Sequence, residues 1–463
     1  MTIYFVAGEV SADNHGAALM RSLRLLDPEL KFIGRGGPQM QQVAGAQFKN
    51  WIGDAAVLGL WEVLRKYGYF REQFRQALNE IRERKPDAVV LIDYPGFNLR
   101  LARALRKQSH SRKTIYYISP QVWAWNRGRI KKMARFIDLV LCIFPFETDV
   151  YAASGLRAVF VGHPMIDRLE RQKIDTHRDQ NLIGLFPGSR SREVRKIFPV
   201  MIEAARRLLE LNPPLRFQVA AASEQLADEM RKMVTPHLNP LPSGRGEAKV
   251  EAEPNESLHQ MSASPTGKAK MEIAPNESSH QTPLPLSRGE ERVRSAKGPL
   301  LDAIEIAVDQ TAAIMQRAFV GIVASGSATL EAAYFAMPFV LIYKVAWPTY
   351  VAARLVVNVD FLGMPNLLAG KEVVPEFIQH EAKPDAIVKA VRLLMEDSPA
   401  RARMISDFDA TTSKLGGTGA SERAAQAILE ELKERRSPDR PGGVPPSRRY
   451  GEPGETASPS RTR

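Results

Sequence analysis

Short apolar runs alternate with helical patterns along most of the chain, and this alternation constrains the fold more than any other feature. In the first half, apolar runs typical of strands cover residues 2–7, 88–92, 114–118, 139–144 and 159–161. Helical patterns follow two of these runs, at about 12–25 and from Asn98 onward. Strands that alternate with helices indicate βαβ units and a parallel sheet.

The same pattern begins again in the second half of the chain. Apolar runs cover 182–186, 216–221, 304–308, 320–323 and 339–343, and a helical pattern covers 194–211. We therefore predict an α/β protein with two Rossmann-like doubly wound domains, 1–170 and 181–365, that face a central cleft. Ligands of such domains bind beyond the carboxyl ends of the strands, so the cleft is the expected site.

Two segments have a composition that does not support a packed core. Residues 236–298 contain eight prolines and no Phe, Tyr or Trp. They also contain two nearly identical heptapeptides, PNESLHQ and PNESSHQ. The tail, 436–463, contains six prolines and one aromatic residue, Tyr450. Such segments bury too little apolar surface to offset the entropy of ordering. We predict a disordered insertion on a surface loop and a disordered tail.

Charge and cysteine content narrow the class of protein. The chain has 64 Lys and Arg against 52 Asp and Glu, a net charge of +12, which favours anionic partners without choosing among them. The single cysteine, Cys142, excludes an internal disulfide, and no residue cluster has metal-ligand spacing, so no metal or cofactor is expected. No run of ~20 apolar residues is present, and residues 1–16 lack a signal-peptide pattern, so we predict a cytosolic protein.

Two motifs follow strands of the first half. AGEVSAD, residues 7–13, supplies a glycine and polar groups where a helix begins, and a plain helix cap explains it equally well. In IDYPGFN, residues 92–98, Asp93 ends a buried type of strand, where a carboxylate is costly unless it is paired or used. A structural Asp93 bonded to loop amides, with Asn98 as the cap of the next helix, is the alternative.

Two further motifs follow strands of the second half. PGSRSRE, residues 187–193, is a turn that opens a helix, and Arg190 adds a fork of donors suited to a phosphate. ASGSATLE, residues 324–331, is a second turn of small residues, and Glu331 can accept bonds from ribose hydroxyls. Tight helix caps are the alternative for both, but two such turns favour nucleotide binding. The absence of GxGxxG and Walker A patterns disfavours a dinucleotide or a P-loop enzyme.

Two weaker features also allow a functional interpretation. Trp123 and Trp125 precede basic residues 127–132 and suggest either an anionic ligand or core tryptophans beside a solvated basic surface. Residues 58–70 are apolar and aromatic with Arg65 and Lys66 between them, which suggests either a membrane contact or ordinary core packing.

Eight motifs occur in the order in which they occur in lipid-A-disaccharide synthases, and from residue 3 to about 432 the chain resembles that family. They are AGEVSADNHGA, IDYPGFN, SPQVWAWNRGRIKK, FPFE, VGHP, LFPGSRSREV, ASGSATLEAA and PNLLAGKEVVPE. The resemblance implies an inverting glycosyltransferase of the two-Rossmann GT-B type. Its substrates would be UDP-2,3-diacylglucosamine and 2,3-diacylglucosamine 1-phosphate, and its products the β(1→6) disaccharide 1-phosphate and UDP.

The resemblance also implies roles for individual residues. Asp93 would be the general base. The acceptor side would include Glu9, Ser11, Asp13, His15 and Asn98. The nucleotide side would include Ser189, Arg190, Ser325, Gly326, Ser327, Thr329, Glu331, Asn366 and Glu376. Two departures from the family pattern affect the acceptor side, since Ala12 replaces a usual glycine and Gly96 stands where some members have a second Asp.

The family resemblance further implies a position in the cell and a set of partners. Helices in 366–435 would cross back to the first domain, and the chain would bind the inner face of the bacterial inner membrane peripherally. Some members form swapped homodimers, and nucleic acid is not an expected partner. Two alternatives remain: another UDP-sugar enzyme of this fold, such as a peptidoglycan glycosyltransferase or an epimerase, and a non-catalytic UDP-sugar or lipid-binding protein.

Overall fold

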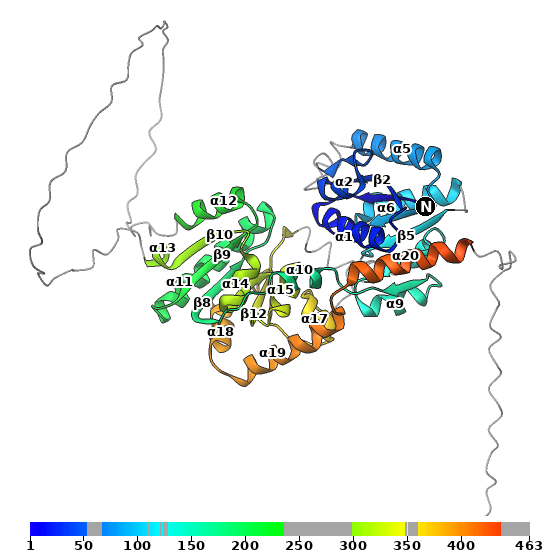
Figure 1. Cartoon of the computed structure of the whole chain (residues 1–463). Coiled ribbons are helices and arrows are strands. Elements are labelled where there is room, and N and C mark those ends of the chain that lie inside the picture. Colours follow the sequence, from blue (N-terminus) through cyan, green and yellow to red (C-terminus); the bar gives the residue numbers. More distant parts are fainter. Residues whose placement is uncertain are drawn as a thin grey trace, which may run out of the picture.

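The structure, a computed structural model, describes residues 1–52, 67–108, 112–120, 123, 128–235, 299–347, 350 and 360–436. It consists of two α/β lobes, each built on a parallel sheet (Figure 1). The predicted insertion, 236–298, lies outside the described residues, as do 53–66. The predicted tail, 436–463, also lies outside them except for Arg436, which is the last residue of a helix.

The first lobe has a seven-stranded parallel sheet in the order β3-β2-β1-β4-β5-β6-β7. Its strands are β1 Thr2–Ala7, β2 Lys31–Gly36, β3 Lys49–Asn50, β4 Ala88–Ile92, β5 Lys113–Tyr117, β6 Leu139–Cys142 and β7 Ala158–Phe160. Its helices are α1 Val10–Leu26, α2 Pro38–Ala44, α5 Tyr67–Arg84, α6 Pro95–Gln108, α8 Gly128–Met133 and α9 Pro145–Ala152. Helix α10, Met165–Arg171, leads to the second lobe.

The second lobe has a six-stranded parallel sheet in the order β10-β9-β8-β11-β12-β13. Its strands are β8 Asp179–Phe186, β9 Arg216–Ala221, β10 Ile304–Val308, β11 Ala318–Ala324, β12 Phe339–Tyr343 and β13 Glu376–Ile378. Its helices are α11 Ser191–Leu211, α12 Glu224–Val234, α13 Pro299–Ala303, α14 Thr311–Arg317, α15 Ser327–Tyr334, α17 Met364–Ala369, α18 Pro384–Met395 and α19 Pro399–Thr412. The short 3₁₀ helix η2, Ser413–Leu415, and α20, Ala420–Arg436, complete the described chain.

Both sheets reverse their strand order at one point. In the first sheet the chain moves outward from β1 to β2 and β3 and then returns to place β4 on the other side of β1. The second sheet repeats this arrangement, with β8 and β11 as the adjacent central strands. The prediction of two doubly wound α/β domains is confirmed. Each lobe therefore has a topological switch point, the place where such folds bind ligands.

The central strands are apolar on both faces because helices cover both. In β1, Ile3 and Phe5 pack into the core on one side of the sheet, and Tyr4 and Val6 pack into the core on the other. All four are at most 1% exposed. This explains why runs such as TIYFVA and AVVLI are continuously apolar rather than alternating.

The last helix returns to the first lobe. Helices α18 and α19 pack against the second lobe, whereas α20 packs along α1 beside the first sheet (Figure 1). Glu431 of α20, which is 2% exposed, accepts ion pairs from Lys113 at 2.6 Å and Arg157 at 2.8 Å. Segment 366–435 is thus not helical throughout, since β13 extends the second sheet, and only its final helix crosses.

Three strands lack the continuous apolar run from which the other strands were predicted. β2 has the sequence KFIGRG, β3 has two residues, and β13 has three. Arg35 in β2 is fully buried because its guanidinium donates to Glu80, to Gln73 and to the Tyr4 hydroxyl. A buried arginine paired in this way cannot be recognised from sequence, because its partners lie on other elements.

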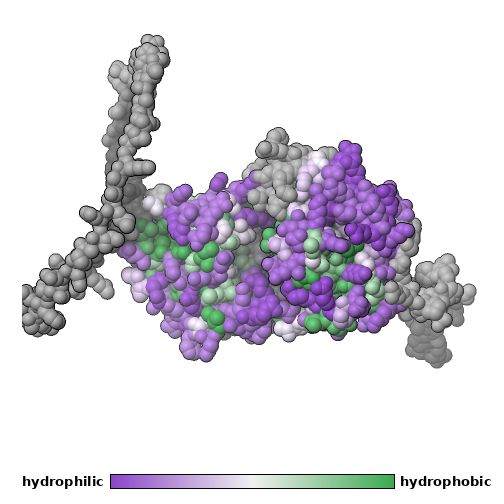
Figure 2. Space-filling view, turned by 45° about the horizontal axis from the view of Figure 1, so that its top comes forward, coloured by the Kyte–Doolittle hydropathy of each residue, from purple (hydrophilic) through white to green (hydrophobic). Residues whose placement is uncertain are grey.

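The face of the molecule drawn in Figure 2 is mostly hydrophilic, with smaller apolar patches on each lobe. Among the described residues, no helix is both long and apolar enough to cross a membrane.

Candidate active site

Asp93 lies directly after β4, at the switch point of the first sheet. Asp93 and Tyr94 both have left-handed backbone conformations, with φ of 45° and 50°. The Asp93 carbonyl accepts bonds from the Tyr116 hydroxyl at 2.6 Å and from Asn98 Nδ2 at 2.7 Å. Two successive non-glycine residues in this conformation are strained, and such strain is typical of functional sites when the surroundings hold it in place.

The Asp93 carboxyl group has a perturbed acidity. Its pKa is raised from 3.8 to about 6, chiefly by burial and also by the Glu9 carboxylate. The backbone N–H of Tyr94 bonds to the carboxylate and acts in the opposite direction. A carboxylate with a pKa near 6 is mostly ionised at neutral pH yet basic enough to accept a proton from a reacting group.

Glu9 and Ser11 lie on the adjacent strand end. β1 neighbours β4 in the sheet, and both residues are exposed at the beginning of α1. The β1–β4 register pairs Ala7 with Ile92, so Glu9 and Asp93 both lie within two residues of paired strand ends, and the Glu9 carboxylate contributes to the raised pKa of Asp93. The first predicted motif and the second therefore come together, as the strand order requires.

Aromatic packing fixes the Asp93 loop, and sequence reasoning missed the residues that do this. The Trp51 indole donates to the Ala7 carbonyl at 2.6 Å and packs edge-on against Tyr94. Gly8 lies so close to Tyr94 that a Cβ at Gly8 would stand 2.4 Å from the ring. Any larger residue at position 8 would therefore displace the loop that carries Asp93. A glycine directly after β1 was the only signal of this in the sequence.

The side chains of Asp13 and Asn98 form hydrogen bonds with backbone groups of the protein. The Asp13 carboxylate, 2% exposed, accepts bonds from the backbone N–H groups of Gly37, Gln39 and Met40 at 2.9–3.0 Å and so caps α2. Asn98 is fully buried, and its amide holds the carbonyls of Ile92 and Asp93. It lies inside α6, which begins at Pro95 rather than near Asn98 as predicted. Both residues therefore hold backbone groups of the first lobe in place.

His15 belongs to a cluster that joins the two lobes. Burial lowers the pKa of His15 to about 4, with Arg168 of α10 contributing. Burial likewise lowers the pKa of His163 to about 3, with His15 and Arg168 contributing. Arg168 also donates to Glu331 at 2.8 Å, on the helix that follows β11. Both imidazoles are therefore neutral at pH 7, and Arg168 connects them to the second lobe.

The predicted nucleotide turns meet at the switch point of the second sheet. Gly188, Ser189 and Arg190 follow β8, and Gly188 has a φ of 106° that favours glycine. Ser325, Gly326 and Ser327 follow the neighbouring strand β11, and Gly326 and Ser327 are exposed. No side chain caps α11 or α15, so the first N–H groups of both helices remain available to an anion.

A basic pocket lies beside the first of these turns, the one that follows β8. It has a volume of about 740 Å³ and contains residues that follow β8, β9 and β12. Its lining includes Ser189, Arg190, Arg192, Lys196 and Lys344. Arg190 is exposed and pairs with Glu193 at 3.1 Å. The charge and the free helix ends suit a diphosphate.

Thr329, Asn366 and Glu376 bond to neighbouring groups within the second lobe. The Thr329 hydroxyl bonds to the Gly326 carbonyl at 2.7 Å. Asn366 is fully buried and bonds to Val373, Val374 and Glu376. The Glu376 carboxylate accepts from the N–H groups of Leu362 and Gly363 at the beginning of α17. These bonds hold the PNLLAGKEVVPE segment, which contains most of α17 and the connection to β13, in a fixed conformation.

The structure describes only part of the two weaker sequence features, the tryptophan pair and the aromatic segment 58–70. Trp123 is 6% exposed and its indole donates to buried Glu147 at 3.0 Å, so this tryptophan is a core residue. Trp125 and most of 58–70 lie outside the described residues. Among the described residues, no group of three or more His, Cys, Asp or Glu could hold a metal ion.

Two Rossmann-like domains in one chain, with polar motifs at the switch point of each sheet, form the GT-B architecture. The family model described as lipid-A-disaccharide synthetase matches residues 3–246 and 272–430. The chain belongs to this family and is a glycosyltransferase. The match is interrupted only at 247–271, within the predicted insertion.

Curated relatives agree with the family match. The chain is 34% identical over 441 residues to the lipid-A-disaccharide synthase of Geobacter sulfurreducens, with 93% of this chain and 97% of that protein covered. It is 32% identical over 438 residues to the enzyme of the same name from Myxococcus xanthus, with 93% and 97% covered.

Two solved structures resemble this chain in fold alone. A putative UDP-N-acetylglucosamine 2-epimerase from Listeria monocytogenes has a TM-score of 0.52 at 11% identity, with 94% of this chain and 96% of that chain covered. The Staphylococcus aureus MnaA–UDP complex has a TM-score of 0.53 at 14% identity, with 93% and 97% covered.

Proposed function

We propose that this chain transfers 2,3-diacylglucosamine from UDP-2,3-diacylglucosamine to 2,3-diacylglucosamine 1-phosphate. The products are the β(1→6)-linked disaccharide 1-phosphate and UDP. The observation that carries this assignment is the family match across both domains, which includes both switch-point motifs. The two solved structures described above share only 11% and 14% identity with this chain, so they support the fold and not the reaction.

Asp93 serves as the general base in this proposal. Its carboxylate takes the proton of the acceptor 6-hydroxyl while that oxygen attacks the anomeric carbon of the donor. The bond from that carbon to the UDP oxygen breaks, and UDP leaves with the electron pair. Attack opposite the leaving group inverts the configuration in one step. The raised pKa of about 6 suits Asp93 to this role at neutral pH.

The second domain binds and stabilises UDP. Arg190 and the uncapped beginnings of α11 and α15 face the diphosphate, where negative charge grows as the bond breaks. Glu331 lies near the ribose, and its ion pair with Arg168 connects the donor site to the acceptor side. Ser189, Ser325, Gly326 and Ser327 supply small groups that let the phosphates approach the backbone. Thr329, Asn366 and Glu376 position this wall.

His15 and Glu9 are the alternative bases. His15 is neutral at pH 7, because its pKa is lowered to about 4, but this low value makes it a weaker proton acceptor than Asp93. Glu9 is exposed beside Asp93. In our assignment Glu9, Ser11 and His15 contact the acceptor, whereas Asp13 and Asn98 position the loops.

Acylated substrates place the reaction at a membrane. We propose that the chain works at the cytoplasmic face of the bacterial inner membrane, bound peripherally. The net charge of +12 supports attraction to an anionic surface. A homodimer remains a prediction from the family resemblance.

A turnover assay tests the assignment. Purified protein is incubated with both acylated substrates, and disaccharide and UDP are quantified. Disaccharide formation by the wild type together with a large loss in folded Asp93→Asn supports both the reaction and the base. Disaccharide from both proteins moves the base to His15 or Glu9. Conversion of UDP-N-acetylglucosamine without an acceptor, and no disaccharide, would instead indicate an epimerase, whose fold this chain shares.

A further inference from the structure

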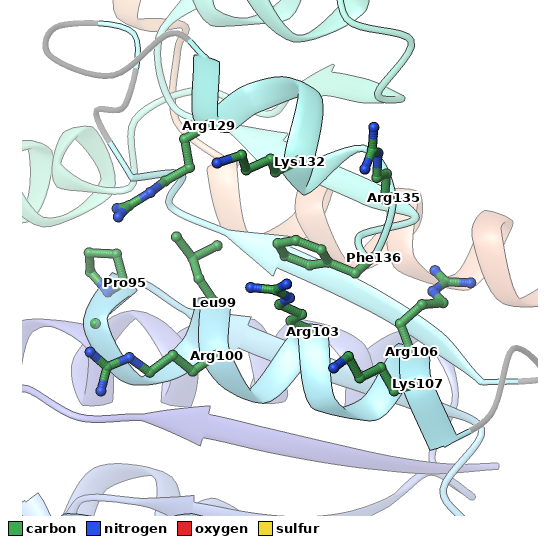
Figure 3. Close-up of a pocket in the computed structure, with 11 residues that line it drawn as sticks. Pro95, Leu99, Arg100, Arg103, Arg106, Lys107, Arg129, Lys132, Arg135 and Phe136 are labelled. Atoms are coloured by element: carbon green, nitrogen blue, oxygen red, sulfur yellow. The ribbon is translucent and has the colours of Figure 1, made fainter.

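A strongly basic groove of about 670 Å³ lies between α6 and α8 (Figure 3). Seven of the eleven residues that line it are Arg or Lys, and none is acidic. Leu99 and Phe136 add apolar surface between the cationic groups. This groove belongs to the first domain and lies on different elements from the basic pocket beside Arg190.

The cationic side chains stand in rows on the two helices. Arg100, Arg103 and Lys107 recur at spacings of three and four along α6, which places them on one face of that helix. Arg129, Lys132 and Arg135 recur at spacings of three on and just after α8. Like charges at these spacings repel one another, which destabilises a free helix. An anionic ligand between the two rows would remove this repulsion.

Few carboxylates compensate this charge. Arg106 pairs with Asp138 at 2.7 Å. Within the described part of the chain, no salt bridge joins Arg100, Arg103, Lys132 or Arg135 to an acidic residue. Arg100 and Arg103 are exposed in the groove, so their guanidinium donors are available to a ligand.

One end of the groove touches the Asp93 loop. Pro95 and Gly96, two and three residues after Asp93, line that end, and Arg100 and Arg129 lie near Pro95 in Figure 3. Lys107 and Arg135 lie toward the other end. Since α6 rises ~1.5 Å per residue, Lys107 is roughly 10 Å farther along the helix than Arg100. The end of the groove with Arg100 and Arg129 is therefore the end nearer the Asp93 loop.

We propose that the end of the groove formed by Arg100 and Arg129 binds the 1-phosphate of the acceptor glycolipid. This inference rests on the proposed function and adds a subsite to it. A phosphate monoester carries close to two negative charges at pH 7, and the planar guanidinium fork matches its oxygens. The donor diphosphate binds at the other domain, so this second cationic site is free for the acceptor. Leu99 and Phe136 provide apolar contact suited to an acylated sugar.

The chemistry of the acceptor fits this placement. In a pyranose, C1 and C5 both flank the ring oxygen, and C5 carries C6 with its hydroxyl. A phosphate held at C1 therefore anchors the ring beside the hydroxyl that reacts. Arg100 and Arg129 would position the acceptor, and Asp93 would take its proton. The site also distinguishes the two substrates, because only the acceptor carries a terminal phosphate at C1.

The test compares two acceptors with three proteins. The acceptors are 2,3-diacylglucosamine 1-phosphate and 2,3-diacylglucosamine without the phosphate, both in neutral detergent micelles. The proteins are wild type, Arg100→Gln and the matched control Lys107→Gln, which removes the same charge at the far end. We expect Arg100→Gln to lower kcat/KM about tenfold for the phosphorylated acceptor and to leave the other acceptor nearly unchanged. Arg100→Lys should recover part of the loss, since charge remains but the fork is lost.

The competing outcomes are distinct. Equal losses for both acceptors, or no loss for either, overturn the proposal. Equal effects of Arg100→Gln and Lys107→Gln, together with weaker sedimentation on phosphatidylglycerol vesicles, would make the groove a general membrane contact and also overturn it. Calorimetric binding of the two acceptors separates this proposal from the proposed function. A wild type that makes no disaccharide but prefers the phosphorylated acceptor through Arg100 keeps the site and rejects the reaction.

Discussion

Replacing Asp93 by Asn should raise stability and abolish most activity, two effects of opposite sign from one substitution. Asn has nearly the same shape, keeps a bond to the Tyr94 N–H and tolerates a left-handed backbone, here with φ of 45°. It removes the buried charge and its repulsion from Glu9. Asp93→Ala would be a poorer test, because alanine tolerates this conformation less well.

The size of the stabilisation follows from the pKa. Burial raises the pKa of Asp93 from 3.8 to about 6, so the folded state disfavours the ionised carboxyl group. The shift corresponds to roughly 3 kcal/mol at pH 8, to about half of that at pH 5, and to almost none below pH 3. Because the folded pKa is raised, this penalty grows between the unfolded and folded pKa values and is complete above the latter. Asp93→Asn should therefore gain stability above pH 6 and lose that gain on acidification.

The activity should move in the opposite direction. Loss of a general base costs roughly 10²- to 10⁴-fold in turnover. Wild-type kcat/KM should rise with pH through about 6 as Asp93 loses its proton, and Asp93→Asn should lack this rise. Urea unfolding at pH 8 and pH 5, with disaccharide formation measured in parallel, provides the data. A less stable Asn variant at pH 8 would refute the burial argument, and an unchanged turnover would refute the role as base.

Three further predictions concern other parts of the molecule. Arg190→Ala should weaken UDP binding roughly 10- to 100-fold through a lost charged hydrogen bond, and unchanged titration calorimetry with UDP would remove it from the diphosphate site. Asp13→Ala should cost about 2–4 kcal/mol of stability, because three backbone N–H groups lose their acceptor, and urea unfolding measures this. If stability is instead unchanged while the acceptor KM rises, Asp13 contacts substrate. Deleting 247–271, where the family match is interrupted, should leave turnover within about twofold of wild type, since such surface insertions are tolerated; a folded but inactive deletion would contradict this.

Much of the fold was readable from the sequence because the central strands are apolar. Five strands, β1, β4, β9, β10 and β12, begin and end where the apolar runs do. The missed strand β2 contains Lys31, Gly34 and Arg35, and its burial depends on partners in other elements. Strands β3 and β13 are too short to produce a pattern.

The candidate site could be predicted only in part from the sequence, because several of its residues depend on partners far away along the chain. Sequence placed Asp93 and Arg190 just after strands and Glu331 one turn into the helix that follows another strand, and the structure brings the motifs together in pairs. It did not reveal that Asp13 caps α2 from a different helix, because its partners are backbone groups 24–27 residues away. It also did not reveal Trp51 and Gly8, whose role is to hold the Tyr94 ring and with it the Asp93 loop.

The sequence by itself determined the fold class, the two domains and the motifs at the strand ends, because these depend on local apolar pattern and turn chemistry. The tertiary structure alone decided which strands are neighbours, and so which motifs share a switch point. It also decided the acidity of Asp93 and the link from Arg168 to Glu331. These properties depend on burial and on charges from distant parts of the chain, and such distances are set only when the chain packs.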